Sequence, residues 1–369
     1  MDFVIMSKTT SDFHRIVVDN IPLLDVRAPV EFAAGAFPGA VNLPILDDEE
    51  RRQVGICYKE KGQEEATNLG HRLVEGEVKR SRVAAWLKLI SRQPETVIYC
   101  FRGGLRSQLA QQWIERESDI KIQRLAGGYK AFRNYLIEQL DPSNIPAIPL
   151  IVGGRTGSGK TLLLHKLNNF VDLEAIANHR GSAFGRFITP QPRQIDFENR
   201  LAYALIRQTY LGNKYMVLED EGSHIGRCYI PPKLVSHFRG DNLILLEIPL
   251  EQRIQIIFDE YVVRSQASYS EAYGLEDGMF RWFAEMNRGV ERIKKRLGDE
   301  RMGRVKKLLE SAYKKQLTAG GGDGHKRWIE ILLCEYYDAM YDYQLSKKSK
   351  SIMFKGGADE VLDFLRAMK

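Results

Sequence analysis

The sequence predicts two α/β domains in series, the second of which carries added helices. The chain has 369 residues, which is more than one hydrophobic core usually supports. Short apolar runs alternate with amphipathic segments on both sides of DPSNIPAIP, a stretch with three prolines in nine residues. We therefore expect a first domain at residues 12–140, a linker at 141–149 and a second domain at 150–369.

Local patterns indicate the elements of the first domain. An apolar run, IPLLDVR, begins at Ile21, and the β-branched and aromatic run VIYC at residues 97–100 is a predicted strand. A glycine-rich turn follows, and residues 105–115 form a predicted helix whose inward side chains are Leu109, Trp113 and Ile114. KIQRLAGGY then predicts another short strand and loop.

The second domain begins with a predicted strand, PLIVGG, followed by a helix at residues 162–167. Two later apolar runs, YMVLED at 215–220 and NLILLEI at 242–248, are typical of buried parallel strands. Beyond about Glu251 we expect mostly helices, with GGGDG at 320–324 as a loop.

Composition favours a soluble, cytoplasmic protein with no membrane partner. Hydrophobic residues make up 44% and charged residues 28%, and no apolar run is long enough to span a bilayer. The start, MDFVIMSKTTSDF, lacks the basic region and apolar core of a secretory signal. No CxxC pair occurs, so neither a disulfide scaffold nor a zinc site is predicted. The four cysteines are Cys57, Cys100, Cys228 and Cys334.

The net charge of +6 is compatible with a polyanionic partner but is too small to require one. Positive charges cluster in the helical part of the second domain, and these clusters form either a solvated helix face or a nucleic-acid track. The clustered residues are Arg292, Lys294, Lys295, Arg296, Arg301, Arg304, Lys306 and Lys307.

Cys100 lies where a nucleophilic sulfur would be activated. It ends a predicted strand and precedes FRGGLRS, which leads into a helix. The loop amides, the positive end of the helix and Arg106 all stabilise an anion, so we expect a thiolate at neutral pH. Gly103 and Gly104 allow the backbone amides to turn inward. The alternative is a buried, inert cysteine.

Residues 24–44, LDVRAPVEFAAGAFPGAVNLP, resemble the opening motif of rhodanese domains, in which the Asp and Arg brace the fold and a PGAxN turn follows. The first domain is therefore expected to be rhodanese-like. Its loop is Cys-x5-Arg, whereas common sulfurtransferases of that fold have Cys-x4-Arg. The longer loop predicts a larger pocket, suited to phosphate or selenium, and leaves a phosphatase as an alternative.

A phosphate-binding loop opens the second domain, which is predicted to be P-loop NTPase-like. GGRTGSGKT contains GxxxxGK[ST] between a predicted strand and a predicted helix, the context that this motif requires. The loop amides would surround a phosphate and Lys160 would add charge to a diphosphate. The residues expected to bind are Gly154, Gly157, Ser158, Gly159, Lys160 and Thr161.

Acidic residues follow the predicted strand at 215–220, and either Glu219 or Asp220 is the candidate that orients a metal-bound water. Thr161 would supply a metal-ligating hydroxyl, and magnesium is the metal compatible with such a site. The alternative is that the two acids simply cap a turn. The sequence leaves the metal ligands unknown, and it does not indicate whether any nucleotide is hydrolysed.

The combination of CFRGGLRS with GGRTGSGKT resembles the tRNA 2-selenouridine synthase family over nearly the whole chain. Three further segments fit that family, NHRGSAFG at 178–185, QPRQIDFEN at 191–199 and LEDEGSHIGR at 218–227. The resemblance implies a transferase that geranylates 2-thiouridine at the tRNA wobble position from geranyl diphosphate. It then replaces the S-geranyl group by selenium from selenophosphate. It also implies that selenophosphate synthase supplies the selenium donor, with no permanently bound cofactor.

Under this resemblance, the P-loop holds geranyl diphosphate and the Cys100 loop receives selenophosphate. Cys100 either attacks selenium to give a selenopersulfide or positions the selenium nucleophile. Arg106 neutralises selenophosphate, and Arg102 either assists or points to solvent. Asp220 is the candidate for metal help at the P-loop.

Further residues are weaker candidates. A basic stretch with His179, Arg180 and Arg186 contacts diphosphate or RNA, or else is a surface loop. Phe184 or Phe187 is expected to stack on the extruded uridine.

His71 is not predicted to be catalytic, and the cysteines other than Cys100 are predicted to be structural. Two rival functions remain open. One is a rhodanese-fold phosphatase or sulfurtransferase with a regulatory P-loop domain, and the other is a non-enzymatic switch module. Oligomeric state and tRNA choice stay undetermined.

Overall fold

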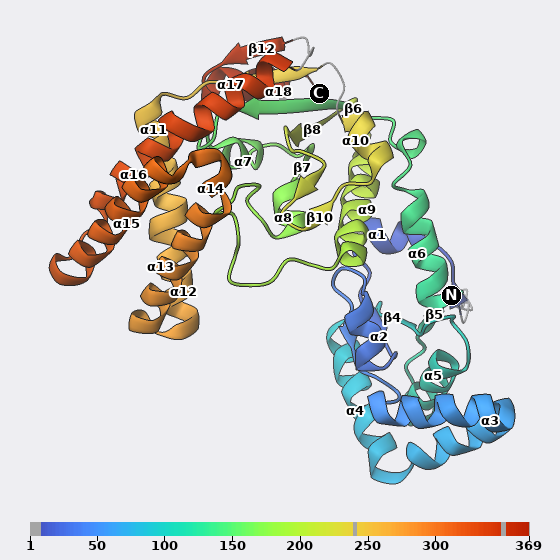
Figure 1. The fold of residues 1–369 in the computed structure, drawn as a ribbon. Helices are drawn as coiled ribbons and strands as arrows, with labels where there is room; N and C mark the ends of the chain where they lie inside the picture. Colours follow the sequence, from blue (N-terminus) through green and yellow to red (C-terminus); the bar gives the residue numbers. More distant parts are fainter. Residues whose placement is uncertain (1–8, 239–241, 348–351, 369) are drawn as a thin grey trace. The chain divides into compact units, whose positions relative to one another are not determined.

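The computed structural model describes residues 9–238, 242–347 and 352–368, and the chain forms two compact units (Figure 1). One unit contains the residues up to Ile145 together with Arg193–Tyr210. The other contains Pro146–Pro192 and the residues from Leu211 onward. The first boundary falls inside the proline-rich segment at 141–149.

The first unit is built on a five-stranded sheet in the order β1-β5-β4-β2-β3, in which every pair of neighbouring strands is parallel. Its central strands are apolar and buried, as expected for a sheet covered on both faces. The strands are β1 (Thr9–Thr10), β2 (Leu23–Asp25), β3 (Val41–Asn42), β4 (Val97–Tyr99) and β5 (Gln123–Leu125).

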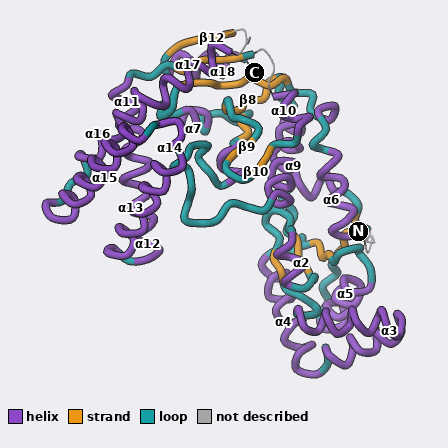
Figure 2. Tube along the Cα trace, in the orientation of Figure 1, coloured by secondary structure: helices purple, strands orange, loops and turns teal. Residues whose placement is uncertain are grey.

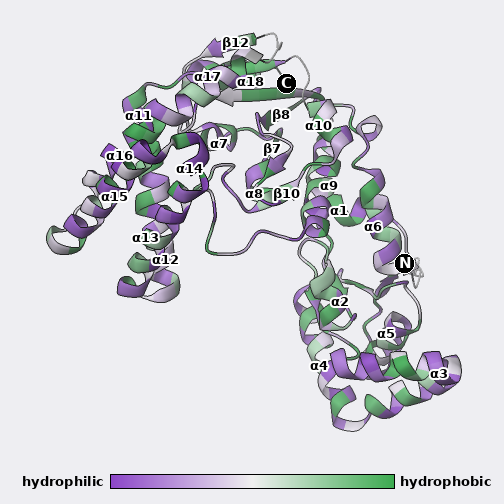
Figure 3. Cartoon of the chain, in the orientation of Figure 1, coloured by the Kyte–Doolittle hydropathy of each residue, from purple (hydrophilic) through white to green (hydrophobic). Residues whose placement is uncertain are grey.

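Helices cover this sheet, and a core that includes Trp86, Trp113 and Ile98 lies beneath them. Polar residues dominate α3, the outer helix of this unit (Figure 3). The helices are α1 (Phe13–Val18), α2 (Pro29–Ala34), α3 (Asp48–Leu73), α4 (Gly76–Arg92), α5 (Leu105–Glu117) and α6 (Gly128–Glu138), followed by the 3-10 turn η1 (Pro142–Asn144).

One helix, α9 (Gln194–Leu211), belongs almost entirely to the first unit although it follows the P-loop in the sequence. Asn199 donates to the Ala36 carbonyl at 2.8 Å, and Arg207 donates to the Val17 carbonyl at 3.0 Å. Arg133 of α6 pairs with Glu198 and donates to Asn199 at 2.8 Å. The predicted division had placed this helix in the second domain. The structure places α9 in the first unit, because its polar side chains have their hydrogen-bond partners there. These partners are more than 60 positions away in the sequence, and buried polar groups need such partners.

The second unit contains a five-stranded parallel sheet in the order β12-β11-β6-β8-β7. β6, β8 and β11 match the predicted strands, whereas β12 lies in a region expected to be mostly helical. The strands are β6 (Ile148–Gly154), β7 (Phe170–Val171), β8 (Tyr215–Glu219), β11 (Leu243–Leu246) and β12 (Ile352–Gly356), with a separate antiparallel pair, β9 (His224–Ile225) and β10 (Cys228–Tyr229).

Helices make up most of the second unit beyond β11 (Figure 2). α11, α13, α15 and α16 enclose a second core around Trp282 and Trp328. The remaining elements are α7 (Lys160–Leu164), α8 (Leu173–Ala177), α10 (Pro232–Phe238), α11 (Leu250–Phe258), η2 (Asp259–Arg264), α12 (Ser265–Tyr273), α13 (Leu275–Arg292), α14 (Lys294–Leu297), α15 (Asp299–Ala319), η3 (Asp323–His325), α16 (Lys326–Leu332), η4 (Leu333–Tyr337), α17 (Asp338–Lys347) and α18 (Ala358–Ala367).

The predicted fold class, two α/β domains with added helices in the second, is confirmed. Within the described residues, no helix is both long and hydrophobic enough to span a bilayer. The prediction about a secretory signal concerns mainly residues 1–8, which lie outside the described residues.

Candidate functional site

In the first unit, Cys100 lies directly after β4 and is buried, with an exposed fraction of 3%. Its Sγ lies 3.2 Å from the Ser107 hydroxyl and 3.8 Å from the Gly104 carbonyl oxygen. α5 begins at Leu105, so the sulfur contacts the N-cap residue and the first turn of this helix. The strand, loop and helix predicted around Cys100 are therefore present.

Arg106, the predicted anion-binding residue, is paired with Glu31 of α2. Its two terminal nitrogens lie 2.5 and 3.1 Å from the two Glu31 carboxylate oxygens. Burial lowers the pKa of Arg106, but the bonds to Glu31, and more weakly the neighbouring Cys100, raise it overall. Glu31 also lies 3.1 Å from Arg51. Sequence reasoning missed Glu31, although it lies within the motif at 24–44.

Gly103 in the Cys100 loop and Gly128 at the start of α6 are in close backbone contact. Gly128 has φ +60°, and a Cβ there would collide with the Cys100 carbonyl oxygen and the Gly103 backbone nitrogen. Arg124 donates to the Gly103 carbonyl at 3.1 Å. The loop therefore depends on close backbone approach. Of the other predicted loop residues, Arg102 is exposed and Gly104 caps α5.

The motif at 24–44 braces the unit as the resemblance implied. Arg27 and Asp25 form a fully buried ion pair at 2.6 Å, and Arg27 also donates to the Gly35 carbonyl. Asn42 of the PGAVN turn donates to the carbonyls of Asp25 and Arg27 at 3.0 and 2.8 Å. These residues hold β2 and β3 in place beside the strand that carries Cys100.

In the second unit, the predicted P-loop residues run from the last residue of β6 into the first turn of α7. Gly154, Gly157, Ser158, Gly159, Lys160 and Thr161 all line one cavity of about 710 Å³. Gly157 has φ +81°, and a Cβ there would lie 2.8 Å from Ile257. Lys160 donates to the Gly154 carbonyl at 3.1 Å. This bond links the last residue of β6 to the first residue of α7, the two ends of the P-loop.

Glu219, at the end of β8, is the acid that faces the P-loop hydroxyl. Thr161 donates to one Glu219 carboxylate oxygen, and the other oxygen has no hydrogen-bond partner among the described residues. Asp220 also lines the cavity, but its backbone N–H bonds back to Val152. The contact to Thr161 therefore favours Glu219 over Asp220 as the acid beside the P-loop hydroxyl.

Five acidic residues line this cavity, namely Glu174, Glu219, Asp220, Glu221 and Glu260. Burial, followed by repulsion from Glu219 and Glu221, raises the pKa of Glu174 to about 9. Burial also raises the pKa of Glu219 to about 7, against the opposing bond from Thr161. Lys160 stabilises the charged form of both. Sequence reasoning did not identify Glu174, which lies in α8.

Arg180 also lines the cavity, next to an aromatic wall. Its guanidinium carbon lies 4.1 Å from the centre of the Phe187 ring and 5.1 Å from that of Tyr261. The Tyr261 hydroxyl pairs with Ser182 at 3.0 Å. Hydrocarbon groups complete this part of the cavity, contributed by Leu162, Ile256, Ile257, Tyr337 and Met340.

A buried arginine fixes the start of the P-loop. Arg253 of α11 donates to the Thr156 carbonyl at 2.9 Å and forms a forked pair with Asp338 of α17, at 3.0 and 2.5 Å. Its exposed fraction is 2%. A fork of this kind holds both partners in one geometry. Sequence reasoning missed Arg253 because its partners are 85 and 97 positions away.

Known proteins match both units. Residues 9–135 match the family described as rhodanese-like domain, and residues 147–369 match the one described as tRNA 2-selenouridine synthase AAA domain. A tRNA 2-selenouridine synthase of Sulfurovum sp. (strain NBC37-1) is 52% identical over 97% of this chain and 98% of its own. A tRNA 2-selenouridine synthase of Hydrogenovibrio crunogenus is 50% identical over 98% of this chain and 99% of its own.

This chain belongs to the tRNA 2-selenouridine synthase family. The predicted family and the two predicted domain types are confirmed by these matches. The roles assigned to individual residues stay predictions, because the matches concern whole domains.

Phe184 was wrongly predicted as a base-stacking residue in this family member. It is 5% exposed and packs against Trp328 and Gly289, so a nucleobase cannot reach its ring. Phe187 is 38% exposed and remains a candidate. The sequence around Phe184 and Phe187 is rich in Gly and Ser and has no hydrophobic periodicity, so it could not predict which of the two rings is buried.

A basic cavity of about 590 Å³ lies beside the P-loop cavity and shares Gly181 and Ser182 with it. His179, which is buried, and Arg186 line it with Arg227 and Arg292. Burial and the neighbouring arginines lower the pKa of His179, so its neutral form is favoured. The basic stretch predicted at 179–186 is therefore split between two cavities.

Many of the clustered basic residues have acidic partners. Arg292 pairs with Glu285 at 2.5 Å, and both Arg301 and Arg304 pair with Glu335. These pairs support the solvated-face interpretation for part of the cluster. The other cysteines differ in environment, since Cys228 is buried, Cys57 is half-buried and Cys334 is exposed.

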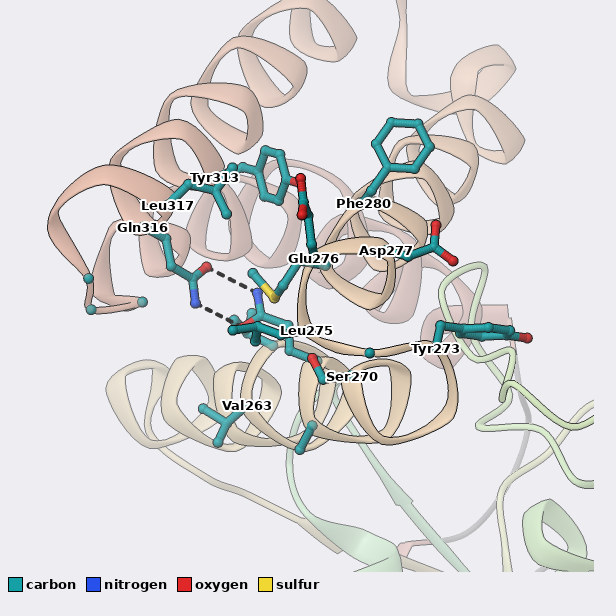
Figure 4. A pocket seen from close by; sticks show the side chains of 18 of the residues that line it. Val263, Ser270, Tyr273, Leu275, Glu276, Asp277, Phe280, Tyr313, Gln316 and Leu317 are labelled. Carbon is teal, nitrogen blue, oxygen red and sulfur yellow. Dashed lines mark hydrogen bonds between the residues drawn. The ribbon is translucent and has the colours of Figure 1, made fainter.

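A larger cavity of about 1300 Å³ lies among α12, α13 and α15 (Figure 4). Gln266 and Gln316 bond to each other across it at 2.8 and 3.1 Å. Leu275 and Phe280 are largely exposed at its edge. None of the predicted site residues lines this cavity.

Proposed function

We propose that this protein converts 2-thiouridine in tRNA to 2-selenouridine in two steps at separate sites. Its relatives carry the name tRNA 2-selenouridine synthase over nearly their whole length. The observation that carries the proposal is the presence of two unlike sites in one chain. One is a thiol loop beside Arg106 in the first unit, and the other is a P-loop cavity with a hydrocarbon wall in the second.

In the first step, the P-loop cavity binds geranyl diphosphate. The sulfur of 2-thiouridine bonds to C1 of the geranyl group, the C1–O bond breaks and diphosphate leaves with the electron pair, while the base loses its N3 proton. Lys160 and the loop amides stabilise the charge that develops on the diphosphate. The hydrocarbon wall formed by Ile256, Ile257 and Met340 matches the prenyl chain.

The residues beside the diphosphate fit Mg²⁺. Thr161 and Glu219 provide hard oxygen atoms, and one Glu219 oxygen has no hydrogen-bond partner among the described residues. When bound, the ion would neutralise charge on the diphosphate. It would also offset the repulsion between that diphosphate and the carboxylate of Glu219.

In the second step, selenophosphate binds at the Cys100 loop with Arg106 holding its phosphoryl oxygens. Selenium bonds to C2 of the base, the C2–S bond breaks and the geranyl thiolate leaves. Water then cleaves the selenium–phosphorus bond, which releases phosphate and leaves 2-selenouridine. Cys100 positions the selenium donor, and the Ser107 hydroxyl, 3.2 Å from the Cys100 Sγ, holds the sulfur in place.

The remaining partners follow from this chemistry. The substrate is tRNA with 2-thiouridine at the wobble position, and a selenophosphate synthase supplies the selenium donor in the cytoplasm. The basic cavity, through Arg186 and Arg227, is the place for tRNA phosphates. Nothing in the described residues favours the phosphatase or the switch module over this function.

Mass spectrometry of tRNA nucleosides tests the proposal. Transfer RNA with 2-thiouridine is incubated with the protein and geranyl diphosphate, with and without selenophosphate. We expect a geranylated nucleoside that becomes selenouridine when selenophosphate is added. Unchanged 2-thiouridine under both conditions would overturn the proposal and would direct attention to phosphatase or sulfurtransferase activity at Cys100.

A further inference from the structure

A second cavity lies in the first unit, next to the Cys100 loop. Its volume is about 300 Å³, and it is bounded by α3, α5 and the segment before α3. Hydrocarbon side chains provide most of its lining, among them Leu46, Val54, Ala66, Val74, Leu109 and Trp113.

The cavity and the Cys100 loop share the first turn of α5. The Gly104 carbonyl oxygen contacts the Cys100 Sγ, and the next two residues, Leu105 and Arg106, line the cavity. Leu105 is 42% exposed, so it lies at the opening rather than in the core. The residue that contacts the Cys100 Sγ, Gly104, is therefore followed directly in the chain by two residues that line the cavity.

The polar groups of the lining do not make it a second anion site. The Thr67 hydroxyl is satisfied within α3, where it donates to the Gln63 carbonyl at 2.8 Å. Gln63 and His71 are exposed. Among the residues that line the cavity, Arg106 alone is an arginine or lysine, and it is the anion-binding residue of the adjoining Cys100 loop, where Glu31 orients it. The interior suits a hydrocarbon chain attached to a polar group at the opening.

We propose that this cavity binds the prenyl chain of S-prenyl-2-thiouridine while C2 of the base faces the Cys100 loop. The inference rests on the proposed function. When selenium bonds to C2 and the C2–S bond breaks, the sulfur leaves with its electron pair as a prenyl thiolate, which water then protonates. The chain stays in the cavity during this exchange and anchors the leaving group beside Arg106.

If the cavity binds the prenyl chain, the alkyl group contributes to substrate binding in the second step. An unalkylated 2-thiouridine has nothing to place in the cavity, whereas a prenylated one gains affinity from each buried methylene. The cavity then selects the alkylated base for reaction with selenium. Its dependence on chain length is the property to measure.

A series of synthetic substrates isolates this step. Anticodon stem-loop oligonucleotides carrying S-methyl-, S-dimethylallyl- or S-geranyl-2-thiouridine are mixed with selenophosphate, and selenouridine is quantified by nucleoside mass spectrometry. We expect kcat/KM to rise along the series by at least about tenfold from methyl to geranyl. Equal values would overturn the inference and leave the proposed function intact. No selenouridine from any substrate would overturn both.

A matched pair of variants locates the effect. Thr67→Phe fills the cavity from α3, and Asn68→Phe places the same ring on an exposed neighbouring position outside the lining. We expect Thr67→Phe to lower kcat/KM for S-geranyl substrate about tenfold relative to S-methyl substrate, and Asn68→Phe to preserve the wild-type ratio. An unchanged ratio in Thr67→Phe would contradict the inference.

A second variant tests the same inference in case Thr67→Phe does not fold. Leu105→Gln makes the opening polar at an exposed position, so the core is left intact. It should also reduce the preference for S-geranyl over S-methyl substrate. Retention of the full preference in Leu105→Gln would count against the cavity as the prenyl site.

Discussion

Glu31 shows how one carboxylate organises the surroundings of the thiol loop. It binds both terminal nitrogens of Arg106 and also lies 3.1 Å from Arg51. Burial raises its pKa, but the bond and charge of Arg106, the backbone bond from Ala28 and the charge of Arg51 together lower the pKa below the ordinary value of 4.5. An incoming anion therefore meets an Arg106 whose orientation is already set.

The lowered pKa of Glu31 predicts a pH-dependent contribution to stability. Since the carboxylate is the form stabilised by folding, its contribution is present above the ordinary pKa of 4.5 and is lost as pH falls through the lower folded value. We expect Glu31→Gln to reduce the free energy of unfolding at neutral pH, with a gap from wild type that narrows below about pH 4.5.

Urea unfolding across this pH range measures the gap. Glu77→Gln serves as the control, because the ion pair between Glu77 and Arg80 is largely exposed and should contribute little. A gap between wild type and Glu31→Gln that widens toward acid pH would contradict the prediction.

At the P-loop, Glu219 rather than Asp220 is expected to support geranylation. Glu219 accepts the Thr161 hydroxyl, and its other oxygen has no hydrogen-bond partner among the described residues. That oxygen would be available to a bound Mg²⁺ or to a water on the ion. We expect Glu219→Gln to lower the geranylation rate about 10- to 100-fold at saturating magnesium, and Asp220→Asn to have a much smaller effect. Initial rates of geranylated nucleoside formation test this, and the reverse order would refute the assignment.

Among the secondary-structure elements, α9 is the one whose position differs most from its place in the chain. It packs on the first unit through Asn199, Arg207 and Glu198, although β6, before it, and β8, after it, belong to the second. The first unit therefore needs a segment that is synthesised after the P-loop. A fragment ending at the predicted linker, residues 141–149, would lack this helix.

The pair between Arg133 of α6 and Glu198 of α9 should stabilise this packing. Both side chains are mostly buried, with exposed fractions of 12% and 17%. Arg133→Ala removes the cation that pairs with Glu198 and the donor to the Asn199 side-chain oxygen. Because Glu198 then keeps only the neutral donor Gln194, we expect a loss of about 2–3 kcal/mol in the free energy of unfolding. Arg80→Ala, which breaks an exposed pair in α4, should cost less than about 0.5 kcal/mol. If urea unfolding gave equal losses of stability for Arg133→Ala and Arg80→Ala, the pair with Glu198 would not stabilise the packing of α9.

For the whole molecule, separate sites for the two steps predict complementation between inactive variants. Cys100→Ala should geranylate 2-thiouridine but yield no selenouridine, and Lys160→Ala should fail at geranylation. When the two variants are mixed with tRNA and both co-substrates, we expect selenouridine to form. Nucleoside mass spectrometry of the mixture is the measurement. Loss of both steps in each single variant would contradict the division of labour.

Binding of tRNA is also a property of the whole molecule. The net charge of +6 is modest, and several basic residues are already paired with acids. Cavity residues such as Arg186 and Arg227 are therefore expected to carry much of the phosphate contact. Because neutralised phosphates release counterions, affinity should fall steeply as salt rises. A flat response in filter binding would remove these phosphate contacts from the proposal.

The sequence by itself determined the features that are contiguous in the chain. Cys100 with its loop and helix, and the P-loop between β6 and α7, could be predicted because their strand, turn and helix are neighbours in sequence and each has its own pattern. The two α/β units follow from alternating apolar runs for the same reason. The family resemblance rests on these same segments.

Only the tertiary structure decided what lies beside these motifs. Glu31 meets Arg106 from 75 positions away, and Arg253 meets Thr156 from 97. Glu219 is distinguished from Asp220 by its contact with Thr161, which lies 58 positions away. The buried stripe of α9 and the residues of β12 carry no signal of which surface they will join. Packing partners distant in sequence are chosen by burial and hydrogen bonding in the folded chain, which local periodicity does not encode.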